Sequence, residues 1–480
     1  MNQDTRPPFD LLACFHGVMD SYHTIDRVEF AQYNEDNWTF KEFTDLLEEK
    51  GLNIDKVVVI ENFQEYNIFY MDYERGLYSI TYLHLNRDLF IKSLFFQTFT
   101  RENTHLINND YRNFYYLSVP HAFKIYDFQK RYREIPTDIV FAIWEEIHTK
   151  LDYSLNKWDK EVLSYVFSYA PKNTYNGKLQ SDGRIKIYRG MGTKSTPIEE
   201  AISWTTDFNM AVLFTSHLDQ NFEGGHKIYV GYVNPDDIIL AIKKEDEIIV
   251  PFEMVQDVAL LNMFDPCRDS VSEIVSYCTT ELLDYAVDFI KVCNKYNINI
   301  RNLGLDHILR VLLYANIITN KYIYLNKELV LEDDFIDLIL YFAMLHDIGK
   351  TNGDVDDTHG EKSVDYICKY EIELVSMYLD DAMREYAHLV IKYHCLDDEK
   401  GIAAIKNLNL SPCDEEQLIL AFKICKDIDA LDRVRFKGLD IDYLRLDCSK
   451  QLPLVANYIY QNNVVKLILE NYELLELIDY

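Results

Sequence analysis

Positively charged side chains are few in this sequence of 480 residues. Lysine and arginine number 48 against 79 aspartates and glutamates, so the formal net charge is −31. Proteins that hold long nucleic acids or anionic membranes need a basic surface, because their affinity comes largely from neutralising phosphates. The charge balance therefore argues against both partners. Small phosphorylated ligands remain compatible with it, since a bound divalent ion can supply positive charge locally.

Cysteine pairs and long apolar runs are also missing. The nine cysteines are scattered without any Cys-x-x-Cys pair, which is typical of free thiols in a reducing compartment. No apolar run reaches the ~18 residues of a membrane span, and the first residues lack the basic and apolar regions of a secretion signal. We therefore expect a cytoplasmic protein.

Hydrophobic patterns divide the chain into an α+β half and a helical half. Residues 1–135 predict a small α+β module of unassigned role, with a helix at 40–50 and strands at 56–60, 67–71 and 77–83. Residues 136–265 predict a second domain with helices at 139–147, 158–170 and 207–217 and strands at 185–189, 201–205, 227–233 and 247–250.

Residues 266–480 have the 3.6-residue period of helices throughout. The longest periodic segments predict helices at 271–296, 305–318, 333–345, 361–379 and 414–428. The expected fold class is therefore multidomain, with an α+β N-terminal half and an all-α C-terminal domain.

Histidines and aspartates of the helical half have an order that suits metal binding. His307 begins one helical pattern, and His346-Asp347 closes a strongly apolar one before Ile-Gly-Lys350. A neutral imidazole nitrogen and a carboxylate oxygen at one helix end can share an ion. Any single histidine on an apolar helix is more often a core residue, so the prediction depends on the joint pattern. The other members of that pattern are His359, His394 and Asp429, and the spacing leaves open whether Asp427, Asp429 or Asp432 is the acidic ligand.

This order resembles the HD superfamily of metal-dependent phosphohydrolases, over roughly residues 300–440. The resemblance implies a helical bundle that binds one or two divalent ions, and Mn, Fe, Mg, Zn and Ni are not distinguished. It implies that Lys350 meets the negative charge that develops on a phosphate. It favours Asp429 among the three aspartates. The implied ligands of the first ion are His307, His346, Asp347 and Asp429, and those of the second are His359 and His394, with Asp347 bridging.

Three polar features follow one another on the predicted strands of the middle domain. Arg189 ends one strand, Ser203 and Thr205 end the next, and Glu245 and Glu247 begin a third. The order Arg, Ser-x-Thr, Glu-x-Glu resembles the arginine-type ADP-ribosyltransferases, whose fold is a split β-sheet.

The second resemblance implies NAD as a co-substrate of the middle domain. Arg189 would bind its pyrophosphate or ribose, since a guanidinium can bond such groups in a bidentate manner. Ser203 and Thr205 would hold the nicotinamide half, with Gly190 and Phe214 beside the cofactor. Glu247 would stabilise the ribose cation, and Glu245 would orient or deprotonate the acceptor.

Together the two resemblances predict a bifunctional enzyme. It would transfer ADP-ribose from NAD to an unknown acceptor, a protein among the candidates, and would hydrolyse phosphodiesters or phosphomonoesters of a nucleotide or ADP-ribose type. The pairing is similar to that of the phosphoribosyl-ubiquitin ligases, in reversed order. One alternative is an HD phosphohydrolase for a nucleotide or cyclic dinucleotide with a non-catalytic, ligand-binding middle domain. Another is a toxin-like defence effector whose HD half regulates the transferase.

Overall fold

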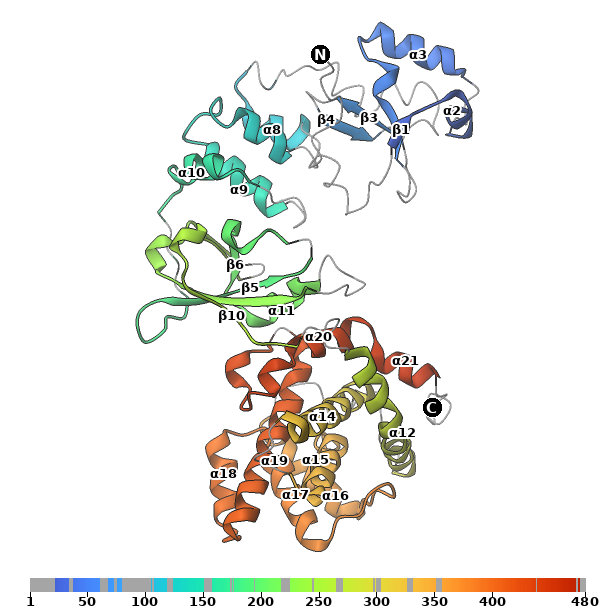
Figure 1. The fold of residues 1–480 in the computed structure, drawn as a ribbon, viewed down its shortest axis with the longest axis vertical. Coiled ribbons are helices and arrows are strands. Elements are labelled where there is room, and N and C mark those ends of the chain that lie inside the picture. The colour runs from blue at the N-terminus through green and yellow to red at the C-terminus, as the bar shows by residue number, and fades with distance from the viewer. Residues whose placement is uncertain are drawn as a thin grey trace. The chain divides into compact units, whose positions relative to one another are not determined.

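The structure is a computed structural model in which the chain forms two compact units, Met1–Lys172 and Asn173–Tyr480 (Figure 1). The residues that it describes are 22–33, 38–60, 68–72, 76–79, 105, 108–118, 124–150, 158–172, 175, 177–193, 195–216, 225–243, 246–264, 271–296, 298, 304–325, 331–350, 356–436, 438–471 and 474.

The first unit contains a four-stranded antiparallel sheet and several helices. The strand order is β1-β2-β3-β4, with bounds Tyr22–Thr24, Val57–Ile60, Ile68–Asp72 and Gly76–Ser79. Helix α3 (Phe40–Glu49) begins with a capping box, because Thr39 and Glu42 each bond the other's backbone N–H. Its further helices are α2 (Arg27–Tyr33), α7 (Tyr111–Asn113), α8 (Lys124–Arg131), α9 (Val140–Lys150) and α10 (Lys160–Phe167).

The second unit begins with a six-stranded antiparallel sheet. Its strand order is β10-β7-β5-β6-β9-β8. Helix α11 (Phe208–Ser216) packs closely against β5, since a Cβ on Gly190 would lie 1.8 Å from the carbonyl oxygen of Ala211. The strands are β5 (Ile185–Met191), β6 (Ser203–Thr205), β7 (Lys227–Val233), β8 (Leu240–Ile242), β9 (Glu247–Ile249) and β10 (Gln256–Leu260).

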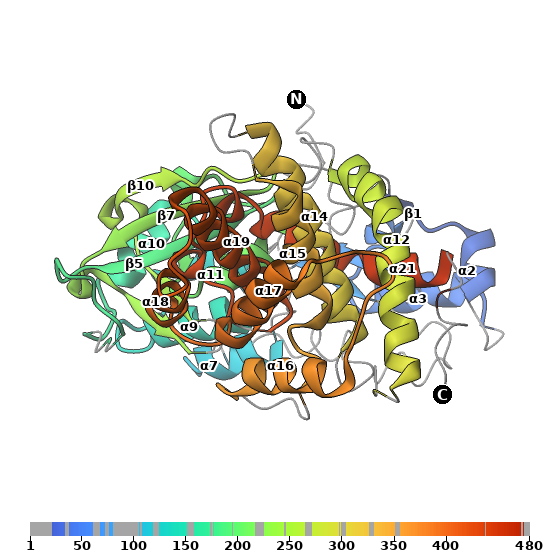
Figure 2. The same ribbon diagram turned by 90° about the horizontal axis from the view of Figure 1, so that it is seen from below.

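The rest of the second unit is a helical bundle around α15 (Asp333–Leu345). Phe335 and every residue of Leu338–Leu345 are buried, as expected for a helical segment that is apolar on all sides from Leu338 onward. In Figure 2 this helix lies between α14 and α17, and it also contacts α19. The other helices are α12 (Val271–Lys295), α14 (Leu305–Leu325), α16 (His359–Tyr370), α17 (Asp381–Tyr393), α18 (Asp398–Lys406), α19 (Pro412–Leu431), α20 (Pro453–Gln461) and α21 (Val464–Asn471).

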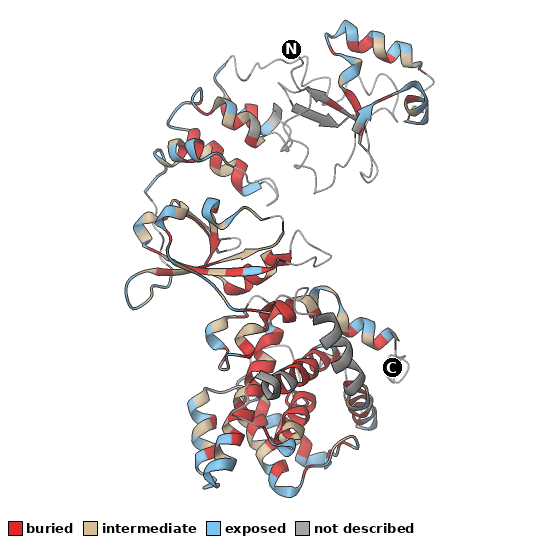
Figure 3. Cartoon of the chain, viewed as in Figure 1, coloured by how far each residue is buried: buried red, intermediate tan, exposed pale blue. Residues whose placement is uncertain are grey.

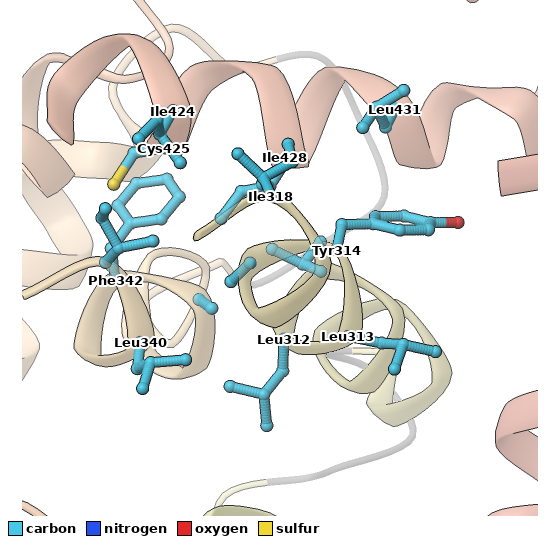
Figure 4. Packing of buried hydrophobic residues seen from close by; sticks show 14 of the residues in the cluster. Leu312, Leu313, Tyr314, Ile318, Leu340, Phe342, Ile424, Cys425, Ile428 and Leu431 are labelled. Carbon is cyan, nitrogen blue, oxygen red and sulfur yellow. The ribbon is translucent and has the colours of Figure 1, made fainter. Parts of the chain in front are cut away.

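One apolar core joins the bundle to the sheet of the same unit. Figure 3 shows the middle helices as largely buried, and Figure 4 shows side chains of α14, α15 and α19 meeting, among them Ile318, Phe342 and Ile428. The same cluster includes Phe208 and Val212 of α11. The sheet and the bundle therefore fold around shared apolar contacts.

Most predicted elements recur with shifted ends, and one prediction is wrong. The helix expected at 361–379 ends at Tyr370, because Glu371 adopts a left-handed conformation (φ 47°) that a right-handed helix cannot continue. The predictions do not include strands β1, β8 and β10. Helices α9 and α10, expected to complete the middle domain, are grouped with the first unit. The boundaries proposed at 135/136 and 265/266 stay predictions.

No helix among the described residues is both long enough and apolar enough to cross a membrane.

The close approach of α11 to β5 predicts a specific cost for a single methyl group. Gly190→Ala should lower the free energy of unfolding by roughly 1–3 kcal/mol, because the new Cβ would overlap the Ala211 carbonyl and force the backbone apart. Urea denaturation measures this. Gly438→Ala is the control, since a Cβ there meets no atom within 4 Å, and it should leave the transition unchanged. An equal effect of both substitutions would contradict the packing argument.

Candidate metal centre

Four histidines from four helices meet inside the bundle. His307 lies in the first turn of α14, His346 directly follows α15, His359 begins α16 and His394 directly follows α17. His307, His346 and His394 are buried, and His359 is half-buried. Because every residue of Leu338–Leu345 in α15 is buried, the residues at the end of this helix are carried into the interior.

Each imidazole is oriented by an acceptor at its Nδ1 atom. A carboxylate or a backbone carbonyl bonded to one ring nitrogen fixes the tautomer and directs the other nitrogen elsewhere. The Nδ1 partners are Asp432 Oδ2 for His307 (2.7 Å), the Phe342 carbonyl for His346 (3.2 Å), the Asp356 carbonyl for His359 and the Ile391 carbonyl for His394 (2.6 Å). All four rings therefore present Nε2 toward the interior of the site.

The Nε2 atoms form two close pairs. Those of His307 and His346 are 3.3 Å apart, and those of His359 and His394 are 2.9 Å apart. Two imidazole nitrogens bound to one ion, each at the ~2.0–2.1 Å of a zinc–nitrogen bond, lie about 2.9–3.4 Å apart for bond angles between about 90° and 110°. Both pairs thus have the separation of two ligands on a shared cation.

A cation also resolves an electrostatic conflict at the second pair. His359 and His394 both donate Nδ1–H to a backbone carbonyl, so two Nε2 lone pairs face each other unless a proton or a metal lies between them. Burial, together with the charge of His346, lowers the pKa of His394 to about 4. A divalent ion between the two Nε2 atoms would remove this conflict.

Asp347 stands between the two pairs with one oxygen toward each. Its Oδ2 lies 3.6 Å from Nε2 of His307 and 3.8 Å from Nε2 of His346, whereas its Oδ1 lies 3.5 Å from Nε2 of His359. Asp429 adds an oxygen to the first pair, with Oδ1 3.6 Å from His307 and 3.8 Å from His346. Asp347 therefore has the position of a carboxylate that bridges two ions.

The charges around His307 indicate an excess of carboxylate. Burial opposes a charged ring, yet the hydrogen bonds to Asp347 and Asp432 and the charge of Asp429 raise the pKa of His307 to about 9. Burial likewise opposes the charge of Asp347, but His346, His307 and Lys350 hold the pKa of this carboxyl well below its usual range. Such a group of ionised acids stabilises a cation placed among them.

Of Asp427, Asp429 and Asp432, it is Asp429 whose carboxylate lies close to the Nε2 atoms of His307 and His346. Asp432 is fully buried, accepts hydrogen bonds from Nδ1 of His307 and Nε of Arg310 (2.5 Å), and forms an ion pair with Arg435, whose Nε lies 2.9 Å away. Asp427 accepts the backbone N–H groups of Arg445 and Leu446. Asp429 thus holds the position that the family resemblance favours, while Asp432 orients a ligand from behind. The ligand roles themselves stay predictions.

Two glycines allow the helices to approach this closely. A Cβ on Gly349 would lie 2.5 Å from the backbone of Lys362, and one on Gly360 would lie 2.4 Å from the Ile391 carbonyl. That carbonyl is the acceptor that orients His394. The Ile-Gly-Lys sequence after His346-Asp347 thus has a packing role.

Lys350 and Cys395 lie at the margin of the centre. Nζ of Lys350 is 3.5 Å from Oδ2 of Asp347, and 27% of the lysine side chain is exposed. Cys395 was not predicted as a site residue, although the sequence places it directly after His394. Together with His359 and His394 it brings three ligand atoms to within 4.8 Å of one another.

The sheet of the second unit gathers part of the other predicted site. Arg189 donates from Nη1 to the Ser203 carbonyl (2.5 Å), and the Ser203 hydroxyl donates to the carboxylate of Glu247. Thr205 is paired with Glu247 across β6 and β9. Burial lowers the pKa of Arg189 to about 10 against the opposing charge of Glu247, so the guanidinium stays charged at neutral pH.

The remaining predicted residues of that site have other positions. Gly190 packs against α11, as described above, and Phe214 lies in the second half of α11, half-buried. Glu245 lies outside the described residues.

Comparison with known proteins bears on the helical half. Residues 304–434 match the model of the HD domain family. Neither the curated proteins nor the solved structures contain a match to the chain. The matched range includes all six predicted ligands, from His307 to Asp429, and it supports a metal-dependent phosphohydrolase domain here. Nothing in the comparisons supports an ADP-ribosyltransferase domain or NAD as a co-substrate.

The positions of the two aspartates predict different losses of metal. Asp347→Ala should weaken the binding of both ions, because each histidine pair loses the shared carboxylate. Asp429→Ala should weaken the binding of only the ion at His307 and His346. Elemental analysis after equilibrium dialysis against Mn²⁺ or Zn²⁺ gives the number of ions per chain. Asp447→Ala, which removes an exposed carboxylate, is the control. Full metal content in Asp347→Ala would contradict the bridging position.

Proposed function

We propose that the helical half hydrolyses phosphate esters of nucleotides with one or two divalent ions. The observation that supports this most strongly is the arrangement of four Nε2 atoms in two pairs on either side of Asp347. A structural zinc site has four protein ligands around one ion and no open coordination position. Two histidine pairs that share a carboxylate instead suit an ion pair of the kind that acts on phosphoryl groups.

Exposure defines the side from which a substrate would enter. His346 and Asp347 are buried, whereas the side chains of Asp429 and Lys350 are 30% and 27% exposed. When bound, the ions would polarise a phosphoryl oxygen and lower the pKa of a water molecule. Lys350 is placed at the same margin, where its ammonium group meets the charge of a phosphate. The histidines stay fixed by their Nδ1 acceptors throughout.

The charge of the chain narrows the substrate class. With a net charge of −31 the protein repels long polyanions, and the centre itself holds three carboxylates. A mononucleotide, a dinucleotide or an ADP-ribose derivative carries few phosphates and can be neutralised by the ions and Lys350. We therefore favour small nucleotides over nucleic acids as substrates.

Hydrolysis assays with the full chain test this proposal. Mononucleotides, cyclic nucleotides, cyclic dinucleotides and ADP-ribose are incubated with Mn²⁺-loaded protein, and the nucleotide, nucleoside and phosphate products are separated and quantified by chromatography. Asp347→Ala should lower kcat/KM at least about 100-fold, because the ions lose their shared ligand. Lys350→Met should lower kcat while metal content stays unchanged.

Matched controls separate this loss from unfolding. Asp447→Ala should keep wild-type activity, and chelation should abolish activity that returned Mn²⁺ restores. Hydrolysis that persists in both Asp347→Ala and the chelated protein would overturn the proposal.

We propose ADP-ribosyl transfer by the sheet as a second candidate function. The observation in its favour is the group of Arg189, Ser203 and Glu247, in which a serine from one strand bonds a buried glutamate of the next. Incubation of the protein with labelled NAD and a cell lysate should label an acceptor. Glu247→Gln should lower labelling at least about 100-fold, because the neutral amide cannot stabilise a ribose cation.

The same experiment distinguishes the alternatives for the sheet. Absence of label with the wild-type protein would favour a non-catalytic, ligand-binding role. Label that persists longer in Asp347→Ala than in the wild type would favour a phosphohydrolase that processes or reverses the modification. Equal labelling by Glu247→Gln and the wild type would overturn the transferase.

A further inference from the structure

We propose that the sheet part of the second unit positions the metal centre through Asn209, an inference that rests on the function proposed for the helical half. Asn209 contacts no ligand of the centre. It would act by holding the segment that follows α19 in place. That segment carries Asp432 and Arg435, which lie behind His307. It is therefore a positioning residue.

The backbone of Asn209 is held on the sheet side. Asn209 is fully buried in the first turn of α11, and its backbone N–H donates to Oδ1 of Asp207 (2.8 Å). The backbone N–H of Asp207 donates in turn to Oγ1 of Thr205 (3.1 Å). The turn between β6 and α11 therefore fixes the backbone from which the amide extends, while Oδ1 of the amide is buried without a hydrogen-bond partner among the described residues.

On the helical side, the amide of Asn209 bonds the main chain. Its Nδ2 donates to the carbonyl of Phe436 (3.2 Å). Phe436 directly follows the 3₁₀ helix η9 (Asp432–Arg435), and its own ring is 60% exposed. The hydrogen bond from Asn209 fixes the backbone carbonyl that follows η9, while the buried side chain of Val434 anchors η9 itself.

The short helix η9 carries two residues that orient His307. Nε of Arg435 lies 2.9 Å from Oδ2 of Asp432, and the same oxygen is 2.7 Å from Nδ1 of His307. A Cβ on Gly304 would lie within 4.0 Å of Arg435 and 3.6 Å from the Cβ of His307, so this region is closely packed. A shift of Phe436 would thus move Arg435 and Asp432 and tilt the imidazole.

The expected loss of metal affinity can be scaled from residues that bond a metal-binding histidine without touching the metal. Loss of a direct partner of a metal-binding histidine typically costs 10–100-fold in metal affinity. Asn209 acts two residues further away, through Phe436 and Arg435. We expect a loss of about three- to tenfold at the ion held by His307 and His346.

Asn457 offers a matched control for this test. It is also a fully buried amide between the sheet part and the bundle, and its Nδ2 donates to Oγ of Ser216 (2.8 Å) at the other end of α11. Its bond does not involve η9. Asn209→Leu and Asn457→Leu therefore remove comparable hydrogen bonds, of which only that of Asn209 is made to the segment at the end of η9.

The experiment measures Zn²⁺ affinity of the full chain by competition with a chromophoric chelator, together with the melting temperature of the metal-free protein. Both variants should melt at lower temperature than the wild type. Asn209→Leu should bind the ion at His307 about three- to tenfold more weakly, and Asn457→Leu should bind it with wild-type affinity. Asn209→Asp, which keeps the size but loses the donor, should behave like Asn209→Leu and serves if the leucine variant does not fold.

Two outcomes would overturn the inference, and they are distinguishable. Equal Zn²⁺ affinity of the Asn209 and Asn457 variants would remove the positioning role and leave the proposed hydrolase intact. Absence of Zn²⁺ and Mn²⁺ binding by the wild-type protein would remove the proposed function and the positioning role together.

Discussion

The need to place four imidazoles and two carboxylates inside or at the margin of an apolar bundle governs the arrangement of its helices. Polar groups removed from water cost free energy unless each finds a partner, and buried charges cost more. The structure meets this requirement at every ring, with Asp432 or a backbone carbonyl at each Nδ1 atom. What remains inside is a set of Nε2 lone pairs and carboxylate oxygens. A bound cation would stabilise such a set, and its binding would then be coupled to folding.

Helix ends provide the geometry that this coupling needs. His346 and His394 each follow the last residue of a helix, so each ring lies within reach of a carbonyl three or four residues earlier. Backbone groups at such ends lack intrahelical partners and are free to orient a side chain. Gly349 and Gly360 bring α16 near enough for His359 to complete the second pair. The ligands are thus held mostly by rigid backbone.

The sequence predicts those parts of the fold and the site that depend on local pattern. The apolar period of α15 and the His346-Asp347 pair at its end are visible in a single stretch, and so are β5, β7 and α11. The end of α16 was missed because Glu371 has no glycine-like signal for its left-handed conformation. The different roles of Asp427, Asp429 and Asp432 could not be read from spacing, since they depend on contacts with Arg445, His346 and His307 from distant segments. Asn209 carries no sequence signal at all, because its partner is a backbone carbonyl more than 200 residues away.

The sheet and the bundle of the second unit share one apolar core, so they are not independent modules. A module joined by a linker can be exchanged without effect on its neighbour, because few contacts cross the boundary. Here Phe208 and Val212 of α11 belong to the same apolar cluster as Ile318 of α14 and Phe342 of α15. Two buried amides, Asn209 and Asn457, also connect α11 to the bundle. A ligand that binds the sheet and displaces α11 would therefore disturb packing and hydrogen bonds around the histidines. Physical contact of this kind gives the two halves of the unit a route of influence that does not require a common substrate.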